Sequence, residues 1–205
     1  MLNIENFALL IEYEKLFTLD NFILSDKQKA LIIGNNDTGK SLFLKAIHGE
    51  HTEFEGNIFI KEKPAIFYRK RKKTILIENS VKFLPKESIW KNIVLPLDKK
   101  KFNKEEKIIE LCNIAGLGEI YNSNADNLSY SSQKLVELIR AVIQQPYLIL
   151  IDDIDNYFDD IKMVRVNEIV KFALDNGTSI ICTSKKKLDD FDISCRIQNG
   201  KMVQL

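Results

Sequence analysis

Eight residues between an apolar run and an amphipathic segment have the types and spacing needed to hold a phosphate group. Gly34 to Ser41 reads G-N-N-D-T-G-K-S and matches the pattern G-x-x-x-x-G-K-[ST]. Glycines let successive backbone N–H groups curl around a phosphate, and a helix N-terminus adds partial positive charge. We expect Lys40 to reach the β- and γ-phosphates of a nucleoside triphosphate and Ser41 to offer its hydroxyl to Mg²⁺. The expected cofactor-binding residues are Gly34, Asn35, Asn36, Asp37, Thr38, Gly39, Lys40, Ser41 and Leu42.

Asp37 is a carboxylate inside this anion-binding loop, so its side chain must point outward to avoid repelling the phosphate. The flanking sequence supports a strand, a loop and a helix in that order. Ala30–Ile33 is a short apolar run of the kind found in buried parallel strands, and residues 42–47 carry apolar side chains at helical spacing.

A second acidic motif lies downstream. Leu148–Ile151 is a run of four apolar residues that ends in Asp152 and Asp153. An acid at the carboxyl end of such a strand is well placed to hold Mg²⁺ through water beside a phosphate loop. We therefore expect Asp152 to complete the metal site that Ser41 begins.

The elements that must position these residues alternate between strand and helix. The sequence favours strands at 2–13, 19–24, 30–33, 57–60, 74–77, 148–151 and 179–183, and helices at 39–49, about 132–144 and about 160–175. Asn103 followed by Glu106 resembles a capping box for a further helix that Gly116 would close. Asn199-Gly200 indicates a two-residue hairpin.

Composition is that of one α/β domain. The chain has 205 residues, 45% hydrophobic and 29% charged, and its net charge of +1 does not point to nucleic acid. Three well-separated cysteines indicate buried or idle thiols in a reducing compartment. No apolar run approaches the roughly 20 residues that span a bilayer, so we expect any membrane association to come through a partner.

The segment between the two motifs resembles a known family. Leu128–Gln133 reads L-S-Y-S-S-Q and precedes Arg140-Ala141-Val142, Pro146 and the strand ending at Asp152. This order resembles the signature region of ATP-binding cassette (ABC) ATPases, whose usual form is L-S-G-G-x-Q before an A-R-A-like helix and a strand ending in D-E. Residues 79–97, with Phe83-Leu84-Pro85 and Ser88–Leu97, resemble the segment after the family's Q-loop that faces a membrane partner.

The resemblance implies a fold and a division of the chain. It implies an α/β P-loop NTPase (RecA-like) core with an N-terminal antiparallel β-subdomain and an inserted α-helical subdomain. The whole chain, 1–205, would form a single ABC nucleotide-binding domain, with the core at 1–78 and 136–205 and the helical subdomain at about 86–134. ATP and Mg²⁺ are the implied cofactors.

The resemblance also implies residue roles. Asp153 stands at the catalytic Glu, Asn79 at the Q-loop Gln and Ser184 at the switch His, and Asn79 joins Ser41 and Asp152 at the metal. Ser129, Ser131 and Gln133 of one subunit would contact the nucleotide of a second subunit. Asp159 matches the last residue of the family's D-loop.

Several of these positions depart from the family. Tyr130 and Ser131 replace two signature glycines, which we expect to weaken or slow closure of a dimer. Asp153 is one methylene shorter than Glu, and a misplacement of about one ångström can cost about a hundredfold in rate. Asn79 is shorter by the same length, so an inward shift of both elements could preserve the geometry. Ser184 cannot carry the positive charge of a histidine.

Two features have alternative interpretations. Tyr13 could stack on adenine or could pack in the core as a strand aromatic. The basic run Tyr68–Lys73 could contact phospholipid headgroups or nucleic acid, or could be a solvated loop, which is the interpretation we favour.

We therefore expect the ATP-binding subunit of an ABC transporter-like membrane complex. It would be cytoplasmic, at the inner face of the cell membrane, paired with a separate integral-membrane permease and a second nucleotide-binding subunit, with no nucleic acid. Ser88–Leu97 resembles small stand-alone cassettes of the FtsE cell-division, LolD lipoprotein-release and phospholipid-transport groups. The alternative is a degenerate, weakly hydrolysing or non-hydrolysing ATP-gated scaffold, in a homodimer or in a heterodimer with a standard cassette.

Overall fold

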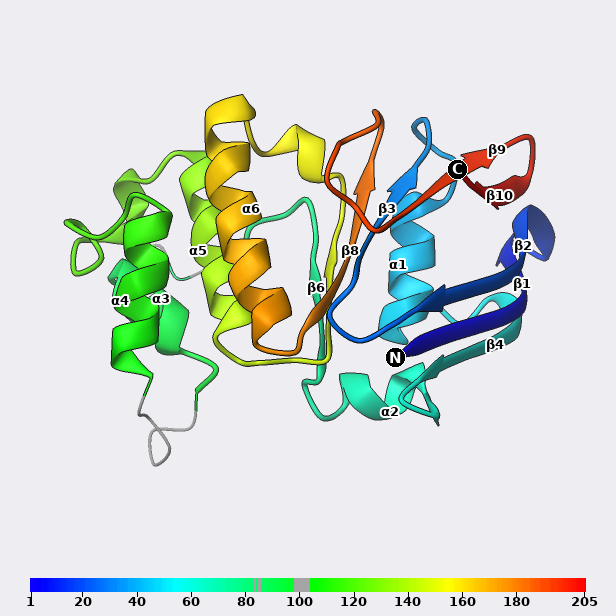
Figure 1. Ribbon diagram of the computed structural model, residues 1–205, viewed down its shortest axis with the longest axis horizontal. Helices are drawn as coiled ribbons and strands as arrows, with labels where there is room; N and C mark the ends of the chain where they lie inside the picture. Colours follow the sequence, from blue (N-terminus) through cyan, green and yellow to red (C-terminus); the bar gives the residue numbers. More distant parts are fainter. Residues whose placement is uncertain (83, 85, 98–103) are drawn as a thin grey trace.

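The computed structural model describes residues 1–82, 84, 86–97 and 104–205 (Figure 1). Phe83, Pro85 and Asn103, which figured in the expectations above, lie outside the described residues. No helix within the described part of the chain is both long and apolar enough to cross a membrane.

One mixed sheet of ten strands, in the order β5-β4-β1-β2-β10-β9-β3-β8-β7-β6, runs through the described residues. The strands β5, β4, β1 and β2 pair antiparallel, whereas β3, β8, β7 and β6 pair parallel and bring their carboxyl ends to one edge. The bounds are β1 Leu2–Ile11, β2 Glu14–Leu24, β3 Lys29–Ile33, β4 Phe54–Ile60, β5 Lys63–Pro64, β6 Thr74–Ile77, β7 Leu148–Ile151, β8 Ser179–Ser184, β9 Ile193–Gln198 and β10 Lys201–Gln204.

Helices cover both faces of the parallel strands. In Figure 1, α1 lies on one side of β3 and β8, and α5 and α6 lie on the other, with α3 and α4 beyond them. The helices are α1 Lys40–His48, α2 Ala65–Arg69, α3 Ile89–Val94, α4 Glu105–Ile114, α5 Tyr130–Val142 and α6 Asp160–Asp175, with short 3-10 turns η2 Ala125–Asn127 and η3 Ile154–Asn156.

Strand β3 shows why residues 30–33 are all apolar. Ala30 and Ile32 pack into a core shared with α1, and Leu31 and Ile33 pack into a second core shared with α5 and α6. Because successive side chains of a strand point to opposite faces, a strand covered on both faces must be apolar at every position. The mixed α/β fold expected from the sequence is confirmed.

Several element boundaries differ from the expectations; β2 and β4, for example, begin at Glu14 and Phe54 rather than at 19 and 57. Helix α5 begins at Tyr130 rather than about Ser132, because the Ser129 hydroxyl caps it by accepting from the Ser132 N–H. Helix α4 has Lys104 at its N-cap, with no side-chain cap, and Asn103 of the predicted capping box lies outside the described residues. Strand β1 stops at Ile11, which leaves Tyr13 in the turn to β2.

The basic run after α2 is solvent-facing. Residues 69–72, from the last residue of α2 into the turn before β6, are exposed. The Arg71 guanidinium stacks on the Phe67 ring at 3.6 Å from its centroid. The three cysteines are buried and free, as expected, and burial raises the pKa of the Cys112 and Cys182 thiols to about 12 and that of Cys195 to about 11.

Candidate functional site

The phosphate loop joins β3 to α1 at the carboxyl edge of the parallel strands. The Gly34 N–H donates to the Ser184 carbonyl at 3.1 Å, which ties the start of the loop to β8. Gly39 has φ +91°, and a Cβ there would lie 2.5 Å from Leu16 Cδ2. Only glycine satisfies both the backbone angle and the contact. Asp37 is exposed, with φ 60°, and is one of the residues that line the cavity beside the loop.

Lys40 is 5% exposed and its ammonium is already oriented by the loop. Its Nζ donates to the Gly34 and Asn35 carbonyls at 2.9 Å each and lies 3.6 Å from Asp153 Oδ1. A lysine held in this way presents its charge to the space above the loop. That space is a cavity of about 340 Å³, lined by Ile11, Leu16, Asn36, Asp37, Gly39, Lys40, Ser41, Leu42 and Asp153.

A threonine that the sequence analysis missed organises the two acids. The Thr183 hydroxyl donates to Asp152 Oδ1 at 2.8 Å and accepts from the Asp153 N–H at 2.7 Å. Thr183 is fully buried on β8, next to β7. A hydroxyl directly after the apolar residues Ile180–Cys182 was the signal that could have identified it, because a hydroxyl buried in a strand needs polar partners.

Asp153 occupies an unusual backbone position. Its φ of 45° lies in the left-handed region, which Asp and Asn adopt more readily than Glu does. Its Oδ1 is buried without a hydrogen-bond partner and faces Lys40. The carboxylate therefore projects toward the cavity, next to the lysine.

The oxygen atoms at this edge suit a hard cation. Ser41 lines the cavity, and Asp153 Oδ1, which also faces it, lacks a hydrogen-bond partner. Asp152 is 5% exposed and accepts from the Thr183 hydroxyl. No cluster of three or more His, Cys, Asp or Glu side chains that could hold a metal occurs among the described residues. Mg²⁺ binds through few carboxylates plus water and substrate phosphates, so this sparse donor set fits Mg²⁺ delivered with a nucleotide.

Asn79 follows β6 and is held by two tyrosines. The Tyr157 hydroxyl donates to Asn79 Oδ1 at 2.9 Å, and the Tyr130 hydroxyl donates to the Asn79 carbonyl. Burial raises the pKa of Tyr157 far above its usual range, and the neighbouring Asp152 carboxylate raises it further. Burial and Glu137 likewise raise the pKa of Tyr130. Both phenols therefore stay protonated and act as donors.

The signature residues lie at the start of α5, away from the chain's own phosphate loop. Ser129 and Tyr130 are exposed, and no residue from 129 to 133 is among those lining the loop cavity. Lys162 on α6 donates to the Ser131 hydroxyl, and Gln133 Nε2 donates back to the Leu128 carbonyl at 3.1 Å. The structure thus does not bring this segment to the phosphate loop of the same chain.

The two remaining predicted residues differ in environment. Ser184 is fully buried, and its hydroxyl donates to the Lys186 carbonyl at 2.8 Å, so its side chain bonds within its own loop. Tyr13 is 96% exposed, with φ 70°. The alternative of a core aromatic at Tyr13 is therefore wrong. Its turn lies between Ile11 and Leu16, which line the cavity.

Comparison with known families identifies this arrangement. The model of the ABC transporter family matches residues 18–156, which include the phosphate loop, the signature segment and the Asp152 strand. The chain belongs to the ABC transporter family. It is an ATP-binding subunit of the family, and membership in this ATPase family implies ATP hydrolysis.

Relatives of this cassette cover most of its length. It is 24% identical to the uncharacterized ABC transporter ATP-binding protein YybJ of Bacillus subtilis, over 97% of this chain and 94% of that protein. It is 28% identical to the zinc import ATP-binding protein ZnuC of Wolbachia pipientis, over 90% of this chain and 73% of that protein.

Solved structures share the fold of this cassette. The ATP-binding subunit of an ABC transporter superposes with a TM-score of 0.84 at 16% identity, covering 100% of this chain and 90% of that one. The ADP conformation of another ABC transporter cassette gives a TM-score of 0.80 at 19% identity, covering 99% and 89%. At sequence identities of 16% and 19%, these comparisons show that the fold is shared.

Proposed function

We propose that this cassette binds Mg²⁺-ATP at residues 34–41, hydrolyses it slowly, and couples the cycle to a separate integral-membrane permease. The observation that carries the proposal is that Lys40 and Asp153 line one cavity beside the loop. Asp152 is joined to Asp153 there through the Thr183 hydroxyl. In this proposal the chain works as one nucleotide-binding domain, with the helical subdomain at about 86–134. It sits in the cytoplasm at the inner face of the cell membrane.

Each residue has a separate task in this mechanism. Lys40 and the N–H groups of the loop hold the phosphates, and Ser41 and Asp152 hold Mg²⁺, with Asp152 oriented by Thr183. The ion, when bound, neutralises charge on the phosphates. Asp153 orients and deprotonates the attacking water, Asn79 adds an oxygen at the metal, and Tyr13 stacks on adenine.

Slow turnover follows from the positions of two groups. The Asp153 carboxylate lies 3.6 Å from the Lys40 ammonium, and its side chain is one methylene shorter than the family's Glu. Ser184 is buried and bonded to Lys186, so this position supplies no positive charge to the γ-phosphate. The general base is therefore shorter, and the γ-phosphate has one positive charge fewer near it than in the family's usual site.

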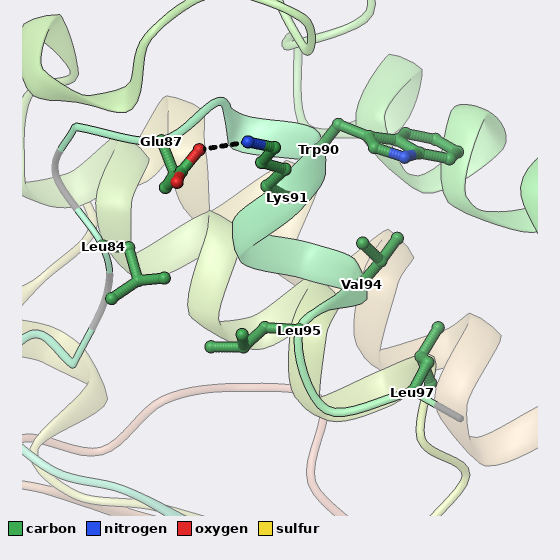
Figure 2. A pocket seen from close by; sticks show the side chains of 7 residues that line it. All are labelled: Leu84, Glu87, Trp90, Lys91, Val94, Leu95 and Leu97. Carbon is green, nitrogen blue, oxygen red and sulfur yellow. Dashed lines mark hydrogen bonds and ion pairs between the residues drawn. The ribbon is translucent and has the colours of Figure 1, made fainter. Parts of the chain in front are cut away.

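A groove on the helical side is the proposed contact with the permease. It has a volume of about 440 Å³ and forms around α3 (Figure 2). The side chains are mainly apolar, with the Glu87–Lys91 ion pair on one side at 2.6 Å. The lining residues are Leu84, Glu87, Trp90, Lys91, Val94, Leu95 and Leu97.

The occupant proposed for this groove is an amphipathic cytoplasmic helix of the permease. Leu95, at 58% exposure, leaves apolar surface for such a helix to cover. The proposed permease is of the lipid, lipoprotein or cell-division type that Ser88–Leu97 resembles. Leu95→Asp should abolish co-purification with that permease and leave basal ATP hydrolysis unchanged, while Val203→Asp, an exposed position on β10, should affect neither.

Phosphate release by the purified chain tests hydrolysis. We expect slow Mg²⁺-dependent release that Lys40→Ala abolishes, with Lys45→Ala, on the same helix, as the control. Release that persists in Lys40→Ala would come from another site or a contaminant and would contradict the proposal.

The second candidate is a non-hydrolysing, ATP-gated scaffold. It is favoured by Tyr130 at a signature glycine position and by the pairing of Asp153 with Lys40. ATP binding and dimerisation without phosphate release, with and without the permease, would select this function over the enzyme.

A further inference from the structure

The loop at residues 78–82, which carries Asn79, is bound along its backbone by the side chains of one helix. Lys134 Nζ donates to the Glu78 carbonyl and, at 3.2 Å, to the Ser80 carbonyl. Tyr130 donates to the Asn79 carbonyl. Every backbone carbonyl from 78 to 80 therefore accepts from α5.

The far end of the same loop is held from the next turns of α5. Glu137 Oε1 accepts from the Lys82 N–H at 2.7 Å, and Arg140 Nη2 donates to the Lys82 carbonyl. The four helix positions 130, 134, 137 and 140 are spaced by four, three and three residues. This spacing places them on one face of α5, along the whole length of the loop.

Lys134 is the centre of this face. Its side chain is 0% exposed, and its third contact is Glu137 Oε2 at 2.8 Å. An ammonium has three donors, and here all three have acceptors: the Glu78 and Ser80 carbonyls and the Glu137 carboxylate. A buried charge is tolerated only when it is paired and hydrogen-bonded, so the position of the loop and the burial of Lys134 depend on each other.

Tyr157, in the segment after Asp153, contacts the same loop, and its ring centroid lies 6.1 Å from that of Tyr130. Its hydroxyl donates to Asn79 Oδ1 at 2.9 Å, and the centroid of its ring lies 4.8 Å from Lys134 Nζ. The Tyr130 ring lies 5.8 Å from the same ammonium. The buried Lys134 ammonium therefore contacts the loop 78–82, the Tyr130 ring at the start of α5 and the Tyr157 ring in the segment after β7.

We propose that Lys134 and Tyr157 are positioning residues that fasten Asn79 and the loop 78–82 to α5, so that the loop and the signature segment move as one unit. The inference rests on the proposed function for the role of Asn79 at the nucleotide. Neither residue lines the phosphate-loop cavity, so both act through the groups they hold.

Hydrogen exchange tests the fastening without reference to activity. In Lys134→Met we expect backbone amides of 78–82 to exchange about tenfold faster than in the wild type, because loss of the buried cation opens the loop locally. The amides of 148–151 should be unchanged. Lys107→Met is the matched control, because Lys107 is an exposed lysine on α4. Equal protection of 78–82 in all three proteins would overturn the proposal.

Tyr157→Phe gives a second variant that keeps the ring beside Lys134 and removes only the hydroxyl. We expect kcat for ATP hydrolysis to fall about fivefold, the effect of one hydrogen bond of ordinary strength, with KM for ATP unchanged. Asn79→Ala should give a similar loss, and the double variant should lose no more than either single one. Tyr68→Phe removes a hydroxyl bonded to the Lys61 carbonyl, far along the chain, and serves as the control.

The outcomes separate this inference from the function on which it rests. Additive losses in the double variant, or unchanged kcat in Tyr157→Phe, would overturn the positioning role. A wild-type chain without phosphate release would contradict the proposed hydrolysis alone. The fastening of the loop would then be accepted or rejected by hydrogen exchange.

Discussion

Asp153 combines a short side chain with a backbone angle that suits Asp better than Glu. At φ 45° the left-handed backbone is reached more easily by Asp and Asn than by longer residues. The same residue pairs with Lys40 across the cavity. The shorter acid and the local backbone are therefore compatible with each other. In the proposed mechanism, the Asp153 carboxylate then extends less far toward the nucleotide than a Glu carboxylate would.

The first prediction tests that cost. Asp153→Glu should raise kcat by about tenfold, because the extra methylene restores reach toward the attacking water. It should also lower the free energy of unfolding by about 1 kcal/mol, because Glu is strained at a positive φ. Phosphate release and urea unfolding measure the two effects.

Asp20→Glu, at an exposed position on β2, is the matched control and should change neither quantity. Unchanged or lower turnover in Asp153→Glu, with Asp153→Asn equally active, would remove Asp153 from the role of base.

His48 gives a second residue-scale prediction, on pH. Burial lowers the pKa of His48; Glu50, with Oε1 3.2 Å from His48 Nδ1, opposes this, and Arg69 adds to it. Below its ordinary pKa of about 6.5 the unfolded chain binds a proton that the folded chain resists, so folding loses stability as pH falls. Between pH 7.5 and 5.5, His48→Gln should lose less stability than the wild type.

Urea midpoints at the two pH values measure this difference. Asn57→Gln, at an exposed position on β4, introduces the same amide without a change of charge, is the control and should behave as the wild type does. If the wild type instead became more stable relative to His48→Gln as the pH fell to 5.5, the attraction of Glu50 for the protonated imidazole would outweigh the effect of burial on the His48 pKa.

At the scale of elements, two serine caps allow a structural effect to be separated from a functional one. The Ser129 hydroxyl caps α5 and the Ser88 hydroxyl caps α3, accepting from Lys91 N–H at 3.2 Å. Each change to Ala should lower the free energy of unfolding by about 1 kcal/mol. Only Ser129→Ala should also weaken ATP-driven dimerisation, because Ser129 belongs to the proposed second half of the nucleotide site.

Urea unfolding measures the change in stability, and sedimentation with ATP measures the change in dimerisation. Equal dimerisation in Ser129→Ala and Ser88→Ala would restrict Ser129 to capping.

The elements also show what a sequence can and cannot predict. Residues 30–41 were predictable because a local pattern, an apolar run followed by a glycine-rich loop, fixes both structure and chemistry. The role of Thr183 and the bonds from Lys134 to the 78–82 loop were not. Thr183 bonds to a residue 31 positions away, and Lys134 bonds to residues more than 50 positions away. No local pattern predicts which strands and helices will become neighbours. The start of α5 was misplaced because Ser129 was assigned only to the nucleotide and not to its own helix.

At the scale of the whole molecule, the proposed two-subunit nucleotide site needs residues that one chain does not bring to its own loop cavity. Lys40 and Asp153 line the cavity, whereas no residue of the signature segment 129–133 is among its lining residues. Ser129 and Tyr130 are exposed, so another subunit can contact them while their hydroxyls keep their bonds to α5 and to the 78–82 loop. A second copy that places its signature over the cavity would enclose the phosphates from both sides.

The last prediction follows from this geometry. Asp153→Asn should retain ATP, because it removes the base and leaves Lys40, Ser41 and Asp152 in place. With Mg²⁺-ATP it should sediment at twice the 23.7 kDa mass of the chain, and without nucleotide as a monomer. Adding Lys40→Ala should return it to a monomer, because the second subunit closes on bound phosphate and not on the empty loop. Asp20→Asn is the control for the lost charge. A nucleotide-independent dimer would contradict a site shared through ATP, and a monomer under every condition would favour pairing with a different cassette, since Tyr130 stands where close approach to phosphate calls for glycine.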